Sequence, residues 1–257
     1  MMTKKYDVKM CKIVRADELV PDSIYDFEIF YPEFAEAAKP GQFAHILLPG
    51  RTLRRPISIC DVNRERGTLR LVFQIRGEGT AQLAEMQEGT FLDVLAPLGN
   101  GFKLEDNSKK AVFVGGGIGV PPLLAAAKFY GRNATVALGF RNKKYVILED
   151  DFKACGADVR IATDDGSYGY HGLVIDLIKD EKPDIIYACG PTPMLRAVAK
   201  FAEENGIECQ ISLEERMACG IGACLGCAVK LRRENGEEYN GHVCKDGPVF
   251  DYKKVVY

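Results

Sequence analysis

Four cysteines near the end of the chain have the spacing of a metal-ligand set. Cys219, Cys224 and Cys227 lie within nine residues in the pattern C-x4-C-x2-C, and Cys244 follows seventeen residues later. Plant-type [2Fe–2S] clusters are ligated with this spacing. The same loop holds three glycines, which can take positive φ and bring their backbone N–H groups close to the sulfides of a cluster. The pattern therefore predicts that four thiolates converge on an iron–sulfur cluster.

Zinc is the main alternative for these ligands. Structural zinc sites usually present two close pairs of Cys or His, whereas here three cysteines share one loop and the fourth stands alone. His242 lies near Cys244, but no second histidine accompanies it, which disfavours a Rieske-type cluster. The three histidines of the chain are scattered, and we expect each to be a surface or structural residue.

Composition and charge exclude several classes of protein. The 257 residues are 47% hydrophobic and 27% charged with a net charge of −2, as in globular proteins of two or more domains. This balance predicts no surface for nucleic acid or for an anionic membrane. Nine cysteines without a secretory signal indicate metal or redox chemistry. The longest apolar run, residues 111–127, is broken by glycine and proline, so we expect no membrane helix and a cytoplasmic location.

The first hundred residues have the pattern of an all-β domain. Apolar and polar side chains alternate, or β-formers dominate, in five short segments, residues 7–14, 24–30, 42–48, 68–75 and 90–95. Together with a further strand near residue 55, this spacing predicts an antiparallel barrel or sandwich over residues 1–102. One helix is expected over residues 80–86.

The next hundred residues alternate between strands and helices. After a polar linker at residues 103–110, predicted strands at 110–114, 134–140, 159–163 and 185–189 are followed by predicted helices at 123–130, 148–154, 173–180 and 193–204. Repeated β–α units predict a doubly wound parallel sheet over residues 103–208. Residues 209–257 then form a small C-terminal cluster domain.

Two segments of the all-β domain could bind a phosphorylated cofactor. In Arg55-Pro56-Ile57-Ser58, an arginine can hold a pyrophosphate while a nearby hydroxyl bonds a ring. In Gly77-Glu78-Gly79-Thr80, glycines at a helix start leave backbone N–H groups free for phosphate. Each segment taken alone is also compatible with a solvated strand or an ordinary strand–helix turn.

Two segments of the α/β domain fall at the edge of the sheet where ligands bind. The loop Gly115-Gly116-Gly117-Ile118-Gly119 follows a buried strand and precedes a helix, although the strict G-x-G-x-x-G fingerprint is absent. Cys189-Gly190-Pro191 ends another strand at the same carboxyl edge. We expect a pyrophosphate at the glycine loop and the Cys189 thiol beside a nicotinamide ring.

A cluster accepts electrons singly, whereas a nicotinamide releases a hydride that carries two. A flavin converts between the two kinds of transfer. We therefore expect the barrel to bind a flavin that connects the nicotinamide domain with the cluster domain.

Along nearly its whole length the chain resembles a known family. The segments 55–58, 77–80, 115–119, 163–167 and 189–191 look like the motifs of the ferredoxin–NADP reductase superfamily. The tail, with Glu214-Glu-Arg-Met-Ala before Cys219 and Val243-Cys244-Lys-Asp-Gly-Pro-Val-Phe250, is similar to the electron-transfer subunit of NAD-dependent (class 1B) dihydroorotate dehydrogenase. The resemblance implies FAD, a [2Fe–2S] cluster, NAD and an FMN-containing catalytic partner, with two copies of each subunit, acting in pyrimidine biosynthesis.

The resemblance also assigns residues to these cofactors. It implies FAD binding by Arg55, Pro56, Ile57, Ser58, Val72, Phe73, Gln74, Gly79 and Thr80. It implies NAD binding by Gly115, Gly116, Gly117, Gly119, Cys189, Gly190 and Pro191, and iron ligation by Cys219, Cys224, Cys227 and Cys244. Electrons would pass from dihydroorotate to FMN in the partner, then to the cluster, FAD and NAD⁺. No (β/α)₈ pattern is present, so no catalytic residue for dihydroorotate oxidation is expected here.

Alternatives stay open at this point. The small subunit of an NADH-dependent ferredoxin–NADP oxidoreductase or sulfide dehydrogenase resembles the chain too, but its relatives tend to carry Asp at the first cluster position, so Cys219 favours the dihydroorotate system. A redox-sensing regulator without turnover is disfavoured because no DNA-binding motif is evident. The basic segment 141–144 could accept a 2′-phosphate or form a solvated turn, so NAD rather than NADP depends on the resemblance. Apolar residues near the cluster, Met217, Ile221 and Leu225, could face a partner or belong to the local core.

Overall fold

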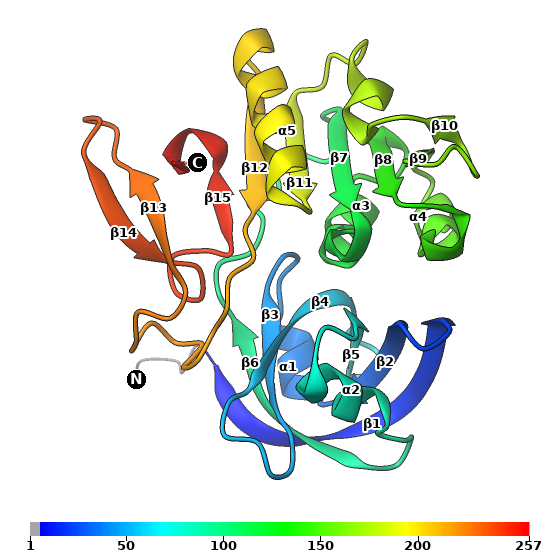
Figure 1. Cartoon of the computed structure of the whole chain (residues 1–257), viewed down its shortest axis with the longest axis vertical. Coiled ribbons are helices and arrows are strands. Elements are labelled where there is room, and N and C mark those ends of the chain that lie inside the picture. Colours follow the sequence, from blue (N-terminus) through cyan, green and yellow to red (C-terminus); the bar gives the residue numbers. More distant parts are fainter. Residues whose placement is uncertain (1–5, 257) are drawn as a thin grey trace.

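A computed structural model describes residues 6–256 and assembles their strands into a closed barrel, a seven-stranded sheet and a two-stranded hairpin (Figure 1). The barrel lies below the sheet in this view, and the hairpin lies to one side. Within the described residues, no helix combines the length and the apolar character needed to cross a membrane.

The barrel contains six antiparallel strands in the order β1-β2-β5-β4-β3-β6. Alternation directs every second side chain inward, where Phe27, Ile46 and Leu71 are buried. The predicted antiparallel barrel is confirmed. Its elements are β1 (Asp7–Val20), β2 (Ile24–Phe30), α1 (Pro32–Ala37), β3 (Phe43–Leu47), β4 (Arg55–Asn63), β5 (Thr68–Gln74), α2 (Glu78–Ala84) and β6 (Phe91–Leu98).

The second sheet has the order β10-β9-β8-β7-β11-β12-β15 and is parallel except at its β12–β15 edge. Its elements are β7 (Ala111–Gly116), η1 (Gly117–Gly119), η2 (Pro121–Leu123), α3 (Leu124–Tyr130), η3 (Gly131–Asn133), β8 (Ala134–Phe140), η4 (Lys143–Tyr145), α4 (Glu149–Ala154), β9 (Asp158–Thr163), β10 (Tyr170–His171), η5 (Val174–Ile178), β11 (Ile185–Cys189), α5 (Thr192–Asn205), β12 (Glu208–Ser212) and β15 (Val249–Asp251). Both faces are covered: Phe113 on β7 packs in the cluster that includes α3 and α4, and its neighbour Val112 packs in the cluster that includes α5. The predicted nucleotide-binding α/β fold is confirmed.

One predicted helix takes a different form. The segment 173–180 contains the short 3-10 helix η5 rather than an α-helix. So short a segment gains few i→i−4 hydrogen bonds, and 3-10 turns are common as connectors.

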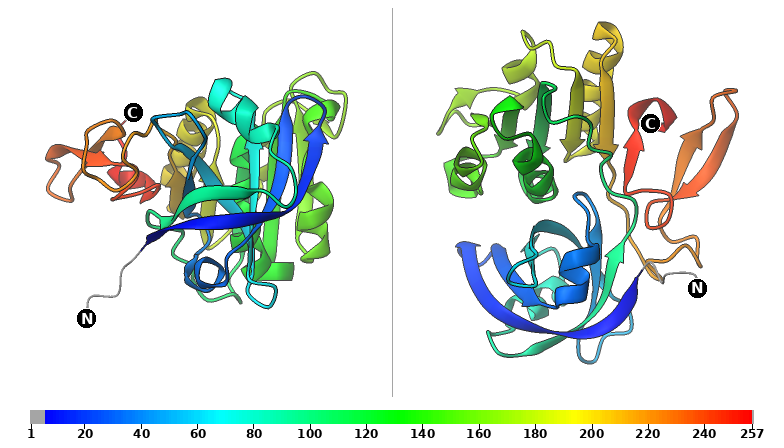
Figure 2. Two further views of the ribbon diagram at one scale, coloured as in Figure 1. Left: turned by 90° about the horizontal axis from the view of Figure 1, so that it is seen from below. Right: turned by 180° about the vertical axis from the view of Figure 1, so that it is seen from behind.

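The C-terminal region touches both larger parts of the molecule (Figures 1 and 2). It contains the hairpin β13 (Ala228–Arg232) and β14 (Glu238–His242) and the 3-10 helix η6 (Tyr252–Lys254). Its buried Cys227, Cys244 and Phe250 pack with Phe43 and Leu98 on the outer face of the barrel. β12 and β15 lie in the large sheet, although both fall at or beyond the predicted boundary at residue 208. The division into residues 1–102, 103–208 and 209–257 stays a prediction.

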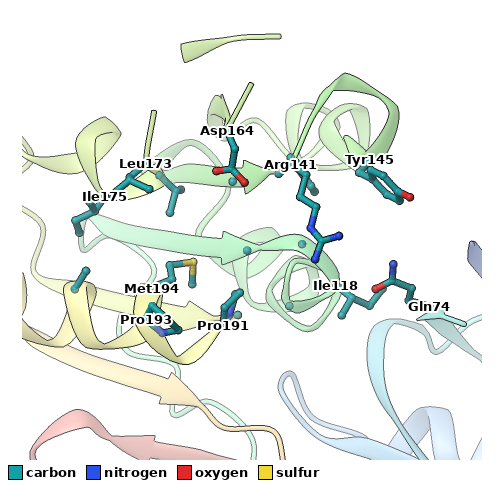
Figure 3. A pocket seen from close by; sticks show the side chains of 18 of the residues that line it. Gln74, Ile118, Arg141, Tyr145, Asp164, Leu173, Ile175, Pro191, Pro193 and Met194 are labelled. Atoms are coloured by element: carbon teal, nitrogen blue, oxygen red, sulfur yellow. The ribbon is translucent and has the colours of Figure 1, made fainter. Parts of the chain in front are cut away.

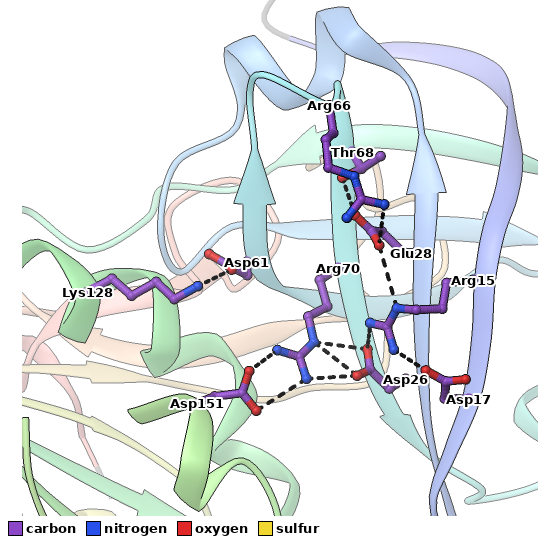
Figure 4. Close-up of polar contacts among 10 residues, drawn as sticks. All are labelled: Arg15, Asp17, Asp26, Glu28, Asp61, Arg66, Thr68, Arg70, Lys128 and Asp151. Atoms are coloured by element: carbon purple, nitrogen blue, oxygen red, sulfur yellow. Dashed lines mark hydrogen bonds and ion pairs between the residues drawn. The ribbon is translucent and has the colours of Figure 1, made fainter. Parts of the chain in front are cut away.

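Ion pairs join the barrel to the sheet (Figure 4). Arg70 on β5 donates to both oxygens of the buried Asp26 at 2.8–3.1 Å and also pairs with Asp151 on α4. Lys128 on α3 pairs with Asp61 on β4. These cross-links fix the orientation of the two parts, and therefore the shape of the space between them.

Candidate functional site

A cavity of about 640 Å³ lies between the barrel and the carboxyl edge of the parallel sheet (Figure 3). Open α/β sheets bind ligands at this edge. In Figure 3 the side chain of Arg141, from the end of β8, extends across the cavity toward Gln74 of the barrel. The lining comprises Ile24, Gln74, Arg76, Gly116, Gly117, Ile118, Gly119, Gly139, Phe140, Arg141, Tyr145, Asp164, Gly172, Leu173, Val174, Ile175, Gly190, Pro191, Pro193, Met194, Ala197 and Glu214.

The two nucleotide motifs predicted from the sequence meet in the floor of this cavity. Gly115 and Cys189 are register partners on the adjacent strands β7 and β11. A Cβ at Gly119 would lie 2.5 Å from the carbonyl oxygen of Cys189, so only glycine permits this approach of two backbones. Gly117 has a φ of +54°, and no described residue has an atom within 4 Å of its Cβ position, which leaves its backbone open to the cavity. A ligand phosphate could therefore approach the main chain here.

Cys189 itself is buried behind the cavity floor, whereas Gly190 and Pro191 line the cavity. Burial raises the pKa of the Cys189 thiol, with a smaller contribution from Glu214. The thiol is therefore protonated at neutral pH. Its contact with a nicotinamide ring stays a prediction.

Three charged residues that line the cavity were not identified from the sequence as site residues: Arg76, Asp164 and Glu214. Asp164 follows β9 at the carboxyl edge and lies in the segment 163–167, which resembles a superfamily motif, although the resemblance gave Asp164 itself no role. Glu214 lies 138 residues from Arg76 in sequence, and no local pattern connects them. Desolvation raises the pKa of the Glu214 carboxyl, and the charge of Arg76 opposes this shift.

The structure brings together the two barrel segments that the sequence predicts to bind a phosphorylated cofactor, residues 55–58 and 77–80. A Cβ at Gly79 would lie 1.9 Å from Nε of Arg55, so the guanidinium of Arg55 lies directly over the start of α2. The Thr80 hydroxyl oxygen accepts hydrogen bonds from the backbone N–H groups of Arg76 and Gly77 at 2.7 and 3.2 Å. Thr80 therefore shapes the turn that presents this helix start to Arg55.

The other predicted flavin residues lie on β4 and β5. Pro56 and Ser58 are half-buried, and Ile57 is buried in the barrel core. Val72 and Phe73 are buried, whereas Gln74 lines the cavity. The Gly79–Thr80 turn lies next to the cavity, because Arg76, whose backbone N–H bonds to Thr80, lines the cavity. Arg55 contacts the same turn at Gly79.

The four predicted metal ligands form two pairs of sulfurs. Sγ of Cys219 and Sγ of Cys224 lie 3.3 Å apart, as do those of Cys227 and Cys244. Gly220 and Gly222 have φ of +71° and +81°. The loop directs backbone N–H groups at sulfur, from Gly222 to Cys244 at 3.1 Å and from Ala223 to Cys219 at 3.3 Å. Such donors stabilise thiolate ligands.

The two pairs differ in burial, and Cys219 and Cys244 differ in acidity. Cys227 and Cys244 are buried against the barrel, whereas Cys219 and Cys224 are partly exposed. Desolvation opposes ionisation of Cys219, but hydrogen bonds from Ile221, Cys224 and Ala223 outweigh it and lower the pKa of that thiol to about 6. Burial and the neighbouring Cys227 raise the pKa of Cys244 to about 12. Cys219 is therefore more readily ionised than Cys244.

Known proteins are similar to this chain over nearly its whole length. A family described as the iron–sulfur cluster binding domain of dihydroorotate dehydrogenase B matches residues 214–256. The electron transfer subunit of dihydroorotate dehydrogenase B (NAD(+)) from Caldanaerobacter subterraneus subsp. tengcongensis is 40% identical over 253 residues, which span 97% of this chain and 99% of the relative. The same subunit from Bacillus caldolyticus is 41% identical, over 95% of this chain and 96% of the relative.

A solved structure is similar over the full length. It comes from a study of flavin-based electron bifurcation by an NADH-dependent reduced ferredoxin-NADP oxidoreductase. It matches with a TM-score of 0.85 and 33% identity, covering 100% of this chain and 91% of that chain.

Proposed function

Because the chain belongs to the family of electron-transfer subunits of NAD-dependent dihydroorotate dehydrogenase B, we propose that its three parts connect an iron–sulfur cluster, FAD and NAD in one path. The chain is a subunit of an oxidoreductase, it contains an iron–sulfur cluster binding domain, and it has the FAD-binding fold of the ferredoxin–NADP reductase superfamily. A catalytic dihydroorotate dehydrogenase subunit is its partner.

The cluster is of the [2Fe–2S] type, held by Cys219, Cys224, Cys227 and Cys244. The pairing of the sulfurs is the observation that carries this proposal, because a two-iron cluster takes two thiolates on each iron. The glycine turns with positive φ and the N–H donors suit an anionic cluster. A single tetrahedral zinc would need all four sulfurs around one point.

FAD binds along the barrel, with Arg55 on its pyrophosphate and Ser58 on its ring. The position of the Arg55 guanidinium over Gly79 supports this assignment, since a helix start and a fixed guanidinium both favour phosphate. Val72, Phe73 and Gln74 flank the ring through their backbone. When bound, the flavin exchanges a hydride with the nicotinamide and single electrons with the cluster.

NAD occupies the 640 Å³ cavity. The glycine loop, through Gly116, Gly117 and Gly119, holds the pyrophosphate, and Gly190 and Pro191 orient the nicotinamide toward the flavin. The cavity supports this placement because residues of the barrel and of the sheet line it together. A nicotinamide there would meet a ring bound to the barrel.

The catalytic partner docks near the outer pair of cysteines. Beside them Leu225 is 76% exposed and Ile221 is 39% exposed, whereas Cys227 and Cys244 are covered by the barrel. Exposed apolar side chains of this kind are typical of interfaces. We propose an assembly with two copies of each subunit.

A second candidate is the small subunit of an NADH-dependent ferredoxin–NADP oxidoreductase, because that structure matches the whole chain. The two functions differ in their electron donor. Purification of the chain with its native partner, followed by an assay of dihydroorotate-dependent NAD⁺ reduction, separates them. Reduction by dihydroorotate is expected; a complex that responds only to reduced ferredoxin would support the second function.

A further inference from the structure

The side chain of His45 on β3 is fully buried, yet neither ring nitrogen has a hydrogen-bond partner among the described residues. Native proteins leave few buried polar groups unpaired, because each such group has lost its hydrogen bonds to water. An apolar side chain would fill the same space without this cost. The imidazole therefore points to a partner that the polypeptide does not supply.

The ring lies between strand β4, which carries Arg55–Ser58, and the loop that carries Cys219, Cys224 and Cys227. On one side, His45 is directly opposite Pro56 of β4, and Phe43 is opposite Ser58, so these four residues share one face of the barrel. On the other side, a Cβ at Gly220 would lie 2.4 Å from Nδ1 of His45. Gly220 follows Cys219 directly, so the imidazole touches the loop that carries the outer cysteine pair.

The charge state of the ring suits a hydrogen-bond donor. Burial, reinforced by the charge of Arg54, lowers the pKa of His45 to about 4. The backbone of Arg54 opposes this shift, but it does not reach hydrogen-bond geometry with either ring nitrogen. At neutral pH the ring is therefore uncharged, with one N–H donor and one nitrogen lone pair. A thiolate or sulfide beside the ring can accept the N–H.

We propose that His45 is a positioning residue for electron transfer, whose ring N–H donates a hydrogen bond to a sulfur of the cluster bound at Cys219, Cys224, Cys227 and Cys244. This inference rests on the cluster of the proposed function and adds a residue from the flavin domain to its surroundings. Hydrogen bonds to sulfur stabilise the more negative, reduced form of a cluster and raise its reduction potential. The same bond holds the cluster loop against the strand that carries Ser58.

Two substitutions at His45 test the bond in the complex with its partner. His45→Phe removes the donor, and His45→Gln keeps an N–H. An EPR-monitored redox titration should show the cluster potential shifted to more negative values in H45F and largely retained in H45Q. His171→Phe, at an exposed histidine on β10, should leave the potential unchanged. An unshifted potential in H45F with full iron content would overturn the proposal, as would a shift of the FAD potential alone.

A measurement without substitution of His45 covers the case in which its variants do not fold. The chain has three histidines, and His242 is close to the ligand Cys244. In a His242→Gln background labelled with ¹⁵N-histidine, pulsed EPR of the reduced cluster should detect coupling to an imidazole nitrogen. Absence of that coupling beside a normal cluster signal would overturn the role of His45. Absence of any cluster signal from the unsubstituted complex would instead overturn the proposed function, and this inference with it.

Discussion

The guanidinium of Arg55 lies over the backbone of Gly79, so close that a Cβ there would come within 1.9 Å of Nε. Two segments 24 residues apart in sequence thus form one surface of the barrel. Their contact explains why a glycine stands at the start of α2. A single methyl group added at Gly79 should therefore change the affinity for FAD, if Arg55 binds its pyrophosphate.

Gly79→Ala should therefore weaken FAD binding. The added methyl displaces the Arg55 guanidinium, and the loss of a charge-assisted bond to phosphate should raise the dissociation constant about tenfold or more, since each factor of ten is about 1.4 kcal/mol. Gly77→Ala is the matched control, because residues 6–256 place no atom within 4 Å of its Cβ position and its φ of 173° suits any residue. Flavin fluorescence during reconstitution measures both constants. Equal affinities for the two variants would contradict the role of Arg55.

Substitution of Arg70 should loosen the junction between barrel and sheet. Arg70→Met leaves the buried Asp26 with Arg15 alone and removes the bond to Asp151, which should cost about 2–3 kcal/mol, below the usual value for a broken buried pair. Arg66→Met is the control: Arg66 pairs with Glu28 in the same network, but its side chain is 62% exposed, and the expected cost is under about 1 kcal/mol. Thermal unfolding of the purified complex measures the difference. Similar melting temperatures for the two variants would show that the network does not join the domains.

Substitution of Asp164 should change the preference for NADH over NADPH. Its carboxylate lines the cavity, where it can accept a hydrogen bond from a ribose 2′-hydroxyl and repel a 2′-phosphate, while Arg141 lies in the same cavity. Asp164→Asn should raise the ratio of kcat/KM for NADPH to that for NADH about tenfold, a change of about 1.4 kcal/mol. Asp165→Asn is the control, because Asp165 bonds Ser167 in the adjacent turn and Asn can still accept those bonds. If both variants keep the original preference for NADH over NADPH, Asp164 does not recognise the ribose 2′-hydroxyl.

The type of fold could be predicted from local patterns. Period-two segments indicated the barrel strands, and the alternation of strands and helices indicated the doubly wound sheet. The order β2-β5-β4-β3-β6 could not be predicted, because pairings such as Phe43 with Ser58 and Leu98 depend on closure of the barrel. β15 was also missed, since a three-residue edge strand has too few residues to show a period.

The candidate site also has some features that local sequence patterns predict and others that arise only on folding. The cysteine spacing and the glycine loops are local. The structure pairs the four sulfurs two by two and places the glycine loop beside Cys189–Pro191. The contact of Arg70 with Asp151, across 81 residues, and the cavity positions of Arg76 and Glu214 arise only in the folded chain. His45 was expected to be a surface or structural residue, because a lone histidine in a strand carries no sign of its burial or of its contact with Gly220.

The central claim, that this chain passes electrons through a four-cysteine cluster, is tested most directly with the anaerobically purified complex and its Cys224→Ser variant. The unsubstituted complex should contain about two irons per copy of this chain in addition to flavin. It should reduce NAD⁺ with dihydroorotate. The Cys224→Ser variant should lose the cluster and this activity, while NADH still bleaches its FAD. The control variant Cys155→Ser, at a half-buried cysteine next to α4, should retain the cluster and the activity. Stoichiometric zinc in place of iron, or dihydroorotate-dependent NAD⁺ reduction by a variant without the cluster, would contradict the claim.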